Sequence, residues 1–327
     1  MEKRPHIVVI GSANIDLIMK TETIPQAGQI YTDGVFATAC GGKGANQAVA
    51  LARLDAHVEF IGRIGQDPFG DILRQNLEHE GVLTTHLIAD HEVHTGTVSI
   101  LINAQGDNAM VADYGSNLRL CPEDIDNIAD VIRQADLVLL QCEVPEPPNI
   151  RASALAQDAG VPVIMNPASI VPSNLEMLRG ISLITPNLGE AEALAALAGT
   201  QFPAAMNPVE KAEQAARVLR DAAGIERIIV TLGSQGAVYV DAQGSQAFEA
   251  FPITQVDVTG AGDCFTATIA YGMATGYPRD EAVTFASAAA ALAVSRLGAQ
   301  PSFPTSKEVQ AFLETQTNPS KATPSED

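Results

Sequence analysis

The chain has 327 residues, of which 39 are Asp or Glu and 19 are Lys or Arg, so its formal net charge at pH 7 is −20. A protein this acidic repels the phosphates of nucleic acids and of anionic membranes, and we exclude both as partners. A nucleotide is still possible as a ligand, because backbone amides and a divalent cation can bind phosphates locally. Hydrophobic residues make up 46% of the chain, enough for one large core with a small appendage.

The four cysteines are widely separated and form no Cys-x-x-Cys pair: Cys40, Cys121, Cys142 and Cys264. We therefore expect reduced thiols in a cytoplasmic protein. No apolar run reaches the length of a membrane span, and the first residues do not resemble an export signal.

Short runs of β-branched and other apolar residues predict buried strands along the chain. They are Ile7–Ile10, Val58–Ile61, Leu137–Leu140, Val161–Met165, Leu183–Thr185, Ile228–Leu232 and Ala237–Val240. Helical stretches rich in Ala and Leu separate several of these runs, which predicts an α/β fold with a mostly parallel sheet. The best-marked helix has Asn207 as its cap, Pro208 in its first turn and a stop at Gly224.

Two segments, 17–36 and 95–114, alternate β-prone and polar residues around turn sequences. They are either surface hairpins or parts of one small β lid. The expected division is an α/β core formed by residues 1–16, 37–94 and 115–314, with the two segments outside it. Residues 315–327 have no apolar face, so we expect a disordered tail there.

The sequence Asp-Val-Thr-Gly-Ala-Gly-Asp at residues 257–263 precedes small and apolar residues typical of a helix. A turn with so few side chains lets backbone amides at a helix start approach an anion closely. The carboxylate of Asp263 beside such an anion site could accept a proton from a hydroxyl group. The alternative is a tight turn with a capping Asp.

A second glycine cluster, at residues 41–46, precedes an Ala-rich helix expected over Gln47–Leu54. Lys43 and Asn46 in this cluster can donate hydrogen bonds to hydroxyls. The cluster is not a Walker A loop, and residues 11–16 do not match the dinucleotide fingerprint. Asp16 follows the first strand, at the edge where α/β sheets bind ligands, although a single Asp there could also cap a turn.

Two further motifs each allow a functional and a local structural interpretation. Asn187 and Glu190 could organise Mg²⁺ through water, or could form a helix capping box. Residues 231–236 could wrap a nucleotide, or could be a glycine turn between strands. His86, His91 and His94 lack a metal-binding pattern, and we expect them on the solvated surface.

The order of these motifs resembles that of the ribokinase-like sugar kinases, also called the phosphofructokinase B family. The resemblance covers nearly the whole chain and rests on residues 41–48, the Asn-x-x-Glu sequence at 187–190 and residues 257–263. It implies a three-layer α/β/α fold with a mostly parallel central sheet. It also implies that the two unusual segments form a β lid over the sugar, and that such lids pair two subunits into a homodimer.

The resemblance also implies the site residues. The sugar would be bound by Asn14, Asp16, Gly42, Lys43, Asn46, Glu143 and Asp263. Asp263 would be the base, and the amides of Gly260, Ala261 and Gly262 would stabilise charge on the transferred group. The nucleotide would contact Asn187, Thr231, Gly233, Ser234, Gly236, Gly262 and Ser287. Mg²⁺ would be held through water by Asn187 and Glu190, and K⁺ by side chains of Asp257 and Ser302 with carbonyls of Thr259, Ala293, Arg296 and Gly298.

Within the family, residues 11–16, 42–47, 166–168 and 298–302 most resemble the members that phosphorylate ribose. The leading hypothesis is therefore transfer of a phosphoryl group from ATP to the 5-hydroxyl of D-ribose, giving ribose 5-phosphate and ADP. The alternatives are another acceptor (deoxyribose, another pentose, a ketohexose or a nucleoside) or a catalytically silent sugar sensor. The chain departs from the family at Thr268, where Gly or Ala is usual, and at Gly189, where a larger residue is common.

Overall fold

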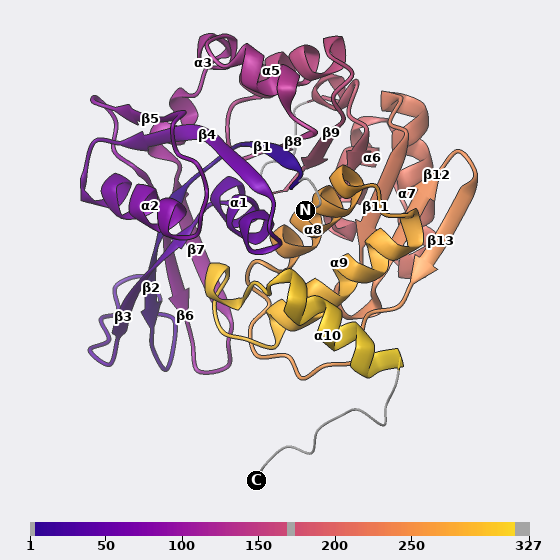
Figure 1. Cartoon of the computed structure of the whole chain (residues 1–327). Coiled ribbons are helices and arrows are strands. Elements are labelled where there is room, and N and C mark those ends of the chain that lie inside the picture. Colours follow the sequence, from indigo (N-terminus) through magenta and orange to yellow (C-terminus); the bar gives the residue numbers. More distant parts are fainter. Residues whose placement is uncertain (1–3, 169–173, 318–327) are drawn as a thin grey trace.

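The computed structural model describes residues 4–168 and 174–317. Its main sheet has nine strands in the order β13-β12-β11-β10-β9-β8-β1-β4-β5 (Figure 1). Their bounds are β1 His6–Ile10, β4 His57–Gly65, β5 Leu87–Asp90, β8 Leu137–Gln141, β9 Val163–Asn166, β10 Leu183–Ile184, β11 Arg227–Thr231, β12 Ala237–Asp241 and β13 Gly244–Phe248. Neighbours from β5 to β11 pair in parallel, and β12 and β13 add an antiparallel edge. The predicted mostly parallel sheet is confirmed.

Helices cover both faces of this sheet, each over its own apolar core. One face carries α1 Lys43–Arg53, α2 Pro68–His79, α8 Ala261–Thr275, α9 Arg279–Val294 and α10 Ser306–Thr317. The other carries α3 Pro122–Asp126, α4 Ala129–Gln134, α5 Glu146–Asp158, α6 Leu188–Leu197 and α7 Pro208–Ala223. Alternate residues of one strand point to opposite faces, so Val9 lies in one core and Val8 in the other. The three-layer α/β/α architecture is confirmed.

Helix ends follow local rules where the capping residues are distinctive. Asn207 caps α7 by accepting a hydrogen bond from the Val209 amide at 2.9 Å, and Gly224 ends the helix with φ +72°, as predicted. Helix α1 begins at Lys43, four residues before the predicted Gln47. The glycines of this segment lower its intrinsic helix propensity, but contacts with the strand β1 region, including the Ala45 amide bound to the Ser12 carbonyl at 2.9 Å, stabilise the earlier start.

A separate four-stranded sheet has the order β3-β2-β6-β7, with bounds β2 Asn14–Lys20, β3 Val35–Gly41, β6 Gly96–Ile102 and β7 Asn108–Asp113. It projects from the end of the main sheet where β1 leads into β2 (Figure 1). Its strands come from both unusual segments, so these segments are one sheet and not independent hairpins. The sheet also takes in residues 14–16 and 37–41, which we had expected in the core.

The helix α10 runs to Thr317, so residues 315–317 are helical and not part of a disordered tail as expected. Apolar contacts of Val309, Phe312 and Leu313 with the core extend this helix beyond the last strongly apolar stretch. Residues 318–327 of the expected tail lie outside the described residues. Within the described ranges, no helix has the length and apolar character needed to span a bilayer. All four cysteines are free thiols.

Candidate active site

Helix α8 begins at a glycine that no other residue could replace without strain. Gly260 has φ +77°, and a Cβ atom there would lie 2.9 Å from the Cβ of Ala299. The turn places Asp263 in the first turn of the helix, where the residue is 4% exposed. A carboxylate this deeply buried needs partners of opposite charge or hydrogen-bond donors.

The partners of Asp263 come from one face of α1. Lys43, Asn46 and Gln47 are spaced i, i+3 and i+4, so their side chains share a face. Asn46 Nδ2 and Gln47 Nε2 donate to the two carboxylate oxygens, both at 3.0 Å, and Lys43 Nζ lies 3.8 Å from Oδ1. The structure thus brings Lys43, Asn46 and Asp263 together as predicted.

Gln47 was missed as a site residue. Its role depends on the true start of α1, because only a helix beginning at Lys43 puts residues 43, 46 and 47 on one face. Its amide orientation is fixed by Gln141, whose Nε2 donates to Gln47 Oε1 at 2.8 Å, so that the NH₂ group of Gln47 faces Asp263. The i, i+3, i+4 spacing from Lys43 was the signal that could have found it.

The protein raises the pKa values of both Asp263 and Lys43, for different reasons. Burial raises the pKa of Asp263 above its ordinary value, although the charge of Lys43 and the hydrogen bonds from Asn46 and Gln47 act in the opposite direction. Burial alone would lower the pKa of Lys43, but the carboxylates of Asp263 and Glu143 hold it above its ordinary value. Lys43 therefore remains a cation next to a carboxyl group that binds a proton more readily than usual.

Glu143 holds the start of α1 against the end of β1. Its Oε2 accepts hydrogen bonds from Ser12 Oγ at 2.6 Å and from the Lys43 amide at 3.0 Å. A carboxylate at a helix N-terminus is favoured by the helix dipole and satisfies one of the free amides. The structure therefore places this predicted residue next to Lys43, where it fixes the first turn of α1.

Asn14, Asp16 and Gly42 lie close together where β2, β3 and α1 meet. Residues 14 and 16 pair in β2 with residues 41 and 39 of β3, and Gly42 follows β3 directly. Burial, reinforced by the negative charge of Glu143, raises the pKa of Asp16 to about 7.

Asn117, in the short 3₁₀ helix Gly115–Arg119, was not predicted. Its side chain accepts from the Ala13 amide at 2.9 Å and donates to Asn14 Oδ1 at 2.8 Å. It therefore fixes the orientation of Asn14. The two residues are 103 positions apart, and no local pattern marks their contact.

A pocket of about 480 Å³ opens beside the start of α8. Apolar side chains, among them Phe251, Phe265 and Val294, line part of it, and the glycines of the turn after β11 line another part. The pocket residues that were predicted to contact a nucleotide are Thr231, Gly233, Ser234, Gly236, Gly262 and Ser287. Asn187 is not among the lining residues, but its backbone forms an isolated β-bridge with Thr231. Because Ala261 and Gly262 also line the pocket, it reaches the turn that carries Asp263.

Asn187 and Glu190 form a capping box at the start of α6. Each backbone amide donates to the other residue's side chain at 2.9 Å. Burial raises the pKa of Glu190, opposed by the Asn187 hydrogen bonds and by Lys43, so Glu190 is close enough to feel the charge of the Lys43 and Asp263 pair. Oε2 accepts a hydrogen bond from the Asn187 amide, and the carboxylate keeps further lone pairs that can accept from water. The arrangement fits an Mg²⁺ ion held through water.

Asp257 forms hydrogen bonds with two chain segments that supply the residues predicted to bind K⁺. Its Oδ1 accepts from the Thr259 amide and hydroxyl at 2.9 and 2.7 Å, and its Oδ2 accepts from the Gly298 amide at 2.9 Å. Burial alone would raise the pKa of Asp257, but these hydrogen bonds hold it below its ordinary value. The carboxylate directly joins the two segments and remains ionised.

Two other residues of this group have protein partners as well. The Ala293 carbonyl accepts from the Arg296 amide at 3.1 Å, and Ser302 Oγ donates to the Ala299 carbonyl at 2.7 Å. Each of these oxygens keeps a further lone pair. An all-oxygen set with one carboxylate fits a large, weakly hydrated monovalent cation. The sequence also allowed Gly298 to serve merely as the end of the Ala-rich helix before it, but α9 ends at Val294, so this alternative is wrong.

Neither departure from the family pattern disturbs the site. Thr268 is 1% exposed, and its hydroxyl donates to the Cys264 carbonyl at 2.7 Å, so the added polar group is satisfied within α8. A Cβ at Gly189 would meet only Asn187 Oδ1, at 3.5 Å, so the position does not require glycine.

Comparison with known proteins gives consistent matches over nearly the whole chain. The family model described as "pfkB family carbohydrate kinase" matches residues 4–306. The chain is 35% identical to the ribokinase of Bacillus subtilis, over 94% of this chain and 99% of that protein. It is 33% identical to a deoxyribokinase of Salmonella typhimurium, over 94% of this chain and 98% of that protein. The solved structure of Arabidopsis thaliana ribokinase with ribose and ATP superposes with a TM-score of 0.84 at 32% identity, over 95% of this chain and 99% of that one. The chain belongs to the pfkB family of carbohydrate kinases.

Proposed function

We propose that the chain transfers the γ-phosphoryl group of ATP to the 5-hydroxyl of D-ribose, giving ribose 5-phosphate and ADP. The observation that carries this proposal is the buried Asp263 carboxylate, bound to Asn46 and Gln47 and facing Lys43, beside a pocket whose wall includes the start of α8. The similarity to ribokinases along the whole chain supports ribose as the acceptor.

Asp263 acts as the general base. It accepts the proton of the 5-hydroxyl while that oxygen forms a bond to the γ-phosphorus, and the bond from the γ-phosphorus to the bridging oxygen of ADP breaks. The raised pKa of Asp263 suits this step, because a carboxylate with increased proton affinity is a stronger base. Asn46 and Gln47 orient both carboxylate oxygens, and Lys43 contributes positive charge beside the reacting oxygens.

The start of α8 stabilises charge on the transferred group. The Ala261 amide donates to the Val258 carbonyl at 3.2 Å, whereas the Gly262 amide has no acceptor within the described part of the chain. Gly262 is therefore the donor best placed for a phosphate oxygen, reinforced by the helix dipole. Gly260 sets the direction of these amides through its left-handed backbone.

Asp16 selects ribose over deoxyribose in this proposal. A carboxylate that accepts hydrogen bonds from two neighbouring hydroxyls loses one of them when the sugar lacks a hydroxyl. The similarity to a deoxyribokinase keeps deoxyribose as the second candidate acceptor. The contacts of Asp263 favour an active kinase over a silent sugar sensor.

Two cations complete the proposed site. Glu190, and Asn187 through its cap, would hold Mg²⁺ through water, and the ion would neutralise phosphate charge on ATP. Asp257, Ser302 and the carbonyls of Thr259, Ala293, Arg296 and Gly298 would hold K⁺. Asp257 bridges the two segments on its own, and a cation there would further fix the turn that presents Gly262.

We also propose that the small sheet is a lid that closes over the sugar and pairs two subunits. Its edge strands β3 and β7 expose apolar side chains: Val35 at 65%, Phe36 at 60%, Met110 at 57% and Val111 at 75%. Exposed apolar edge strands favour association with a second copy. Closure would exclude water, the competing acceptor of the phosphoryl group. The cytoplasmic location stays a prediction.

The test is an assay of ADP release by the purified chain with Mg²⁺, K⁺ and a panel of sugars and nucleosides. We expect the highest kcat/KM with D-ribose, a lower value with deoxyribose because of Asp16, and little turnover without acceptor. A nucleoside or ketohexose as the best substrate would overturn the choice of acceptor. An absence of ADP release with every compound would overturn the proposed kinase activity.

A further inference from the structure

A group of polar side chains lies at the opposite end of the main sheet from the site described above. The site residues follow the carboxyl ends of the strands, whereas His6 and His57 are the first residues of β1 and β4. The two strands are parallel neighbours with His6 directly opposite His57. Residues two apart on a strand point to the same face, so Glu59 joins both rings on one face of the sheet.

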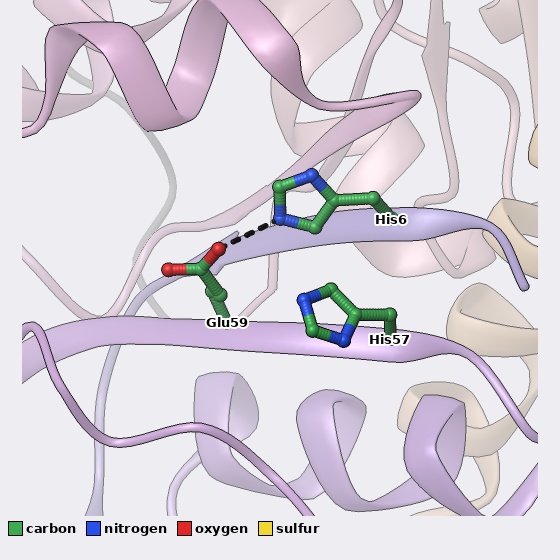
Figure 2. Close-up of side chains that lie close together, drawn as sticks. All are labelled: His6, His57 and Glu59. Carbon is green, nitrogen blue, oxygen red and sulfur yellow. Dashed lines mark hydrogen bonds and ion pairs between the residues drawn. The ribbon is translucent and has the colours of Figure 1, made fainter.

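The three side chains converge (Figure 2). His6 Nε2 lies 2.9 Å from Glu59 Oε1, and one ring nitrogen of His57 faces the same carboxylate. One ligand atom from each residue lies within 4.8 Å of the others. The centroids of the two rings are 5.0 Å apart. In the described part of the chain, neither ring nitrogen of His57 has a hydrogen-bond partner, so this ring has a free ligand atom toward Glu59.

A third imidazole reaches the same carboxylate from the loop before β5. His86 Nε2 lies 3.4 Å from Glu59 Oε2. We expected His86 on the solvated surface, but its side chain is only 29% exposed, and those of His6 and Glu59 are 19% and 15% exposed. His57 is exposed and leaves the group open to solvent on one side. The carboxylate is thus surrounded by three imidazoles that do not belong to the sugar or nucleotide site.

We propose that His6, His57 and Glu59 bind a divalent transition metal of the Zn²⁺ class, with water as the fourth ligand and His86 bound to the other oxygen of Glu59. Imidazole and carboxylate are ordinary ligands of Zn²⁺, and sets of two His with one Glu, or of three His, are found at protein-bound zinc. Nitrogen ligands favour Zn²⁺, Ni²⁺ or Cu²⁺ over Mg²⁺ and Ca²⁺. The ion would replace the hydrogen bond between His6 and Glu59 and would link β1 to β4.

Only small movements are needed to reach this geometry. Tetrahedral ligands at about 2.0–2.1 Å from zinc are about 3.3–3.4 Å from one another. The contact of Glu59 Oε1 with His6 Nε2 is shorter than this spacing, at 2.9 Å, so the two side chains need only separate slightly. The ligand atoms of His6, His57 and Glu59 all lie within 4.8 Å of one another, and rotation of the exposed His57 ring can bring its nitrogen closer to the other two.

The test is calorimetric titration of ZnCl₂ into the purified full-length chain after treatment with EDTA, in the presence of excess MgCl₂ to occupy sites made of carboxylates alone. The variants are His57→Ala, Glu59→Gln and, as a matched control, His91→Ala, whose exposed ring binds Gln66 outside the group. We expect one Zn²⁺ per chain in the wild type and in His91→Ala. His57→Ala should bind it at least about tenfold more weakly, because even loss of an outer partner of a metal ligand costs that much.

Absorption of bound Co²⁺ identifies the ligands independently. We expect the visible bands of four-coordinate Co²⁺ with nitrogen and oxygen ligands in the wild type, and their loss in His57→Ala. Equal Zn²⁺ affinity in the wild type and His57→Ala, no binding to the wild type, or a sulfur-to-metal charge-transfer band from a cysteine would each overturn the proposal. His57 is exposed, so His57→Ala should fold even if Glu59→Gln does not.

Discussion

Asp263 is deeply buried, and both oxygens of its carboxylate accept hydrogen bonds. Two amides from α1 bind its two oxygens, and the Lys43 ammonium lies 3.8 Å away. These contacts hold the side chain in one orientation, which a general base needs if it is to meet a hydroxyl at hydrogen-bond distance. The same contacts make this residue sensitive to replacement.

Asp263→Asn should lower kcat by roughly 10²-fold or more while nucleotide binding remains near that of the wild type. The amide keeps the size of the side chain but cannot accept the proton. The measurement is kcat for ADP release together with an ATP dissociation constant and a thermal unfolding curve. Asp280→Asn, at an exposed position of α9, serves as the matched control. Near-normal turnover in a folded Asp263→Asn protein would contradict the assignment.

Asp16 should make sugar binding depend on pH. Its pKa is raised from 3.8 to about 7, so the folded chain binds more protons than the unfolded chain between these values. This residue's contribution to stability is present below about pH 4 and is lost as pH rises through about 7. Sugar binding has the opposite sign, because the ionised carboxylate accepts two hydroxyl hydrogens.

Ribose affinity should therefore increase up to about tenfold from pH 6 to pH 8 in the wild type and stay flat in Asp16→Asn. Equilibrium titration calorimetry measures this without interference from the catalytic step. Asp16→Ala should mainly raise the sugar KM, with less effect on kcat. Identical ribose dissociation constants at both pH values in the wild type would show that Asp16 does not bind the sugar in its ionised form.

Sequence patterns located most of these residues because their motifs are local. Asp263 follows a glycine turn, and Lys43 and Asn46 lie in a glycine cluster. Gln47 and Asn117 were missed for different reasons. Gln47 depends on where a helix begins, and Asn117 depends on a contact across 103 positions that only the folded chain creates.

At the level of elements, Gly42 connects β3 to α1 through a conformation reserved for glycine. Its φ is +89°, and a Cβ there would lie 2.7 Å from Ala13 Cα and 2.8 Å from the Asn14 amide nitrogen. Both neighbours are backbone atoms that cannot move without shifting β2. The connection between the small sheet and the first turn of α1 therefore does not tolerate a side chain at residue 42.

Gly42→Ala should reduce the free energy of unfolding by at least about 3 kcal/mol and weaken sugar binding. The cost of the left-handed backbone for Ala adds to the cost of the clash between its Cβ and the backbone of Ala13 and Asn14. Gly28→Ala is the matched control. Gly28 has a similar φ, +84°, but a Cβ there would meet nothing within 4 Å, so only strain of about 1 kcal/mol remains. Chemical denaturation of both variants gives the comparison. Equal losses would mean that the contacts around Gly42 relax freely.

Elements were predicted well where the pattern is long and the ends are marked. The buried strands and helix α7 follow from apolar runs and from Asn207, Pro208 and Gly224. The start of α1 and the end of α10 were not predicted correctly, because tertiary contacts override weak local helix preferences there. The alternation in the two unusual segments predicted strands, but their assembly into one sheet depends on the pairing of Asn14 with Gly96, far along the chain.

At the scale of the whole molecule, Asp257 links the turn before α8 to the segment after α9. Turnover of the wild type should be faster in K⁺ than in Na⁺ at equal ionic strength, because the larger, weakly hydrated ion suits the oxygen set. Asp257→Ala should lower the rate in both salts and abolish the difference between them. The ratio of the two rates is the measurement. Equal rates in K⁺ and Na⁺ for the wild type would remove the cation from the mechanism.

Subunit pairing should depend on the apolar edges of the small sheet. Phe36→Asp with Val111→Asp should shift the molar mass measured by light scattering from dimer to monomer, because charges on exposed edge strands oppose association. Ile72→Asp, which changes an exposed apolar residue of α2 outside that sheet, should leave the mass unchanged. A monomeric wild type would contradict the pairing.

The small sheet is joined to the site by very short connections. Only residues 11–13 separate β1 from β2, and only Gly42 separates β3 from α1. A rotation of the sheet must therefore move Asn14 and Lys43 with it. If pairing of two such sheets favours one orientation, ribose binding and dimerisation are thermodynamically coupled. The factor by which ribose tightens the dimer then equals the factor by which dimerisation tightens ribose binding. Because these connections are so short, contact between two small sheets would make ribose binding by the two subunits cooperative.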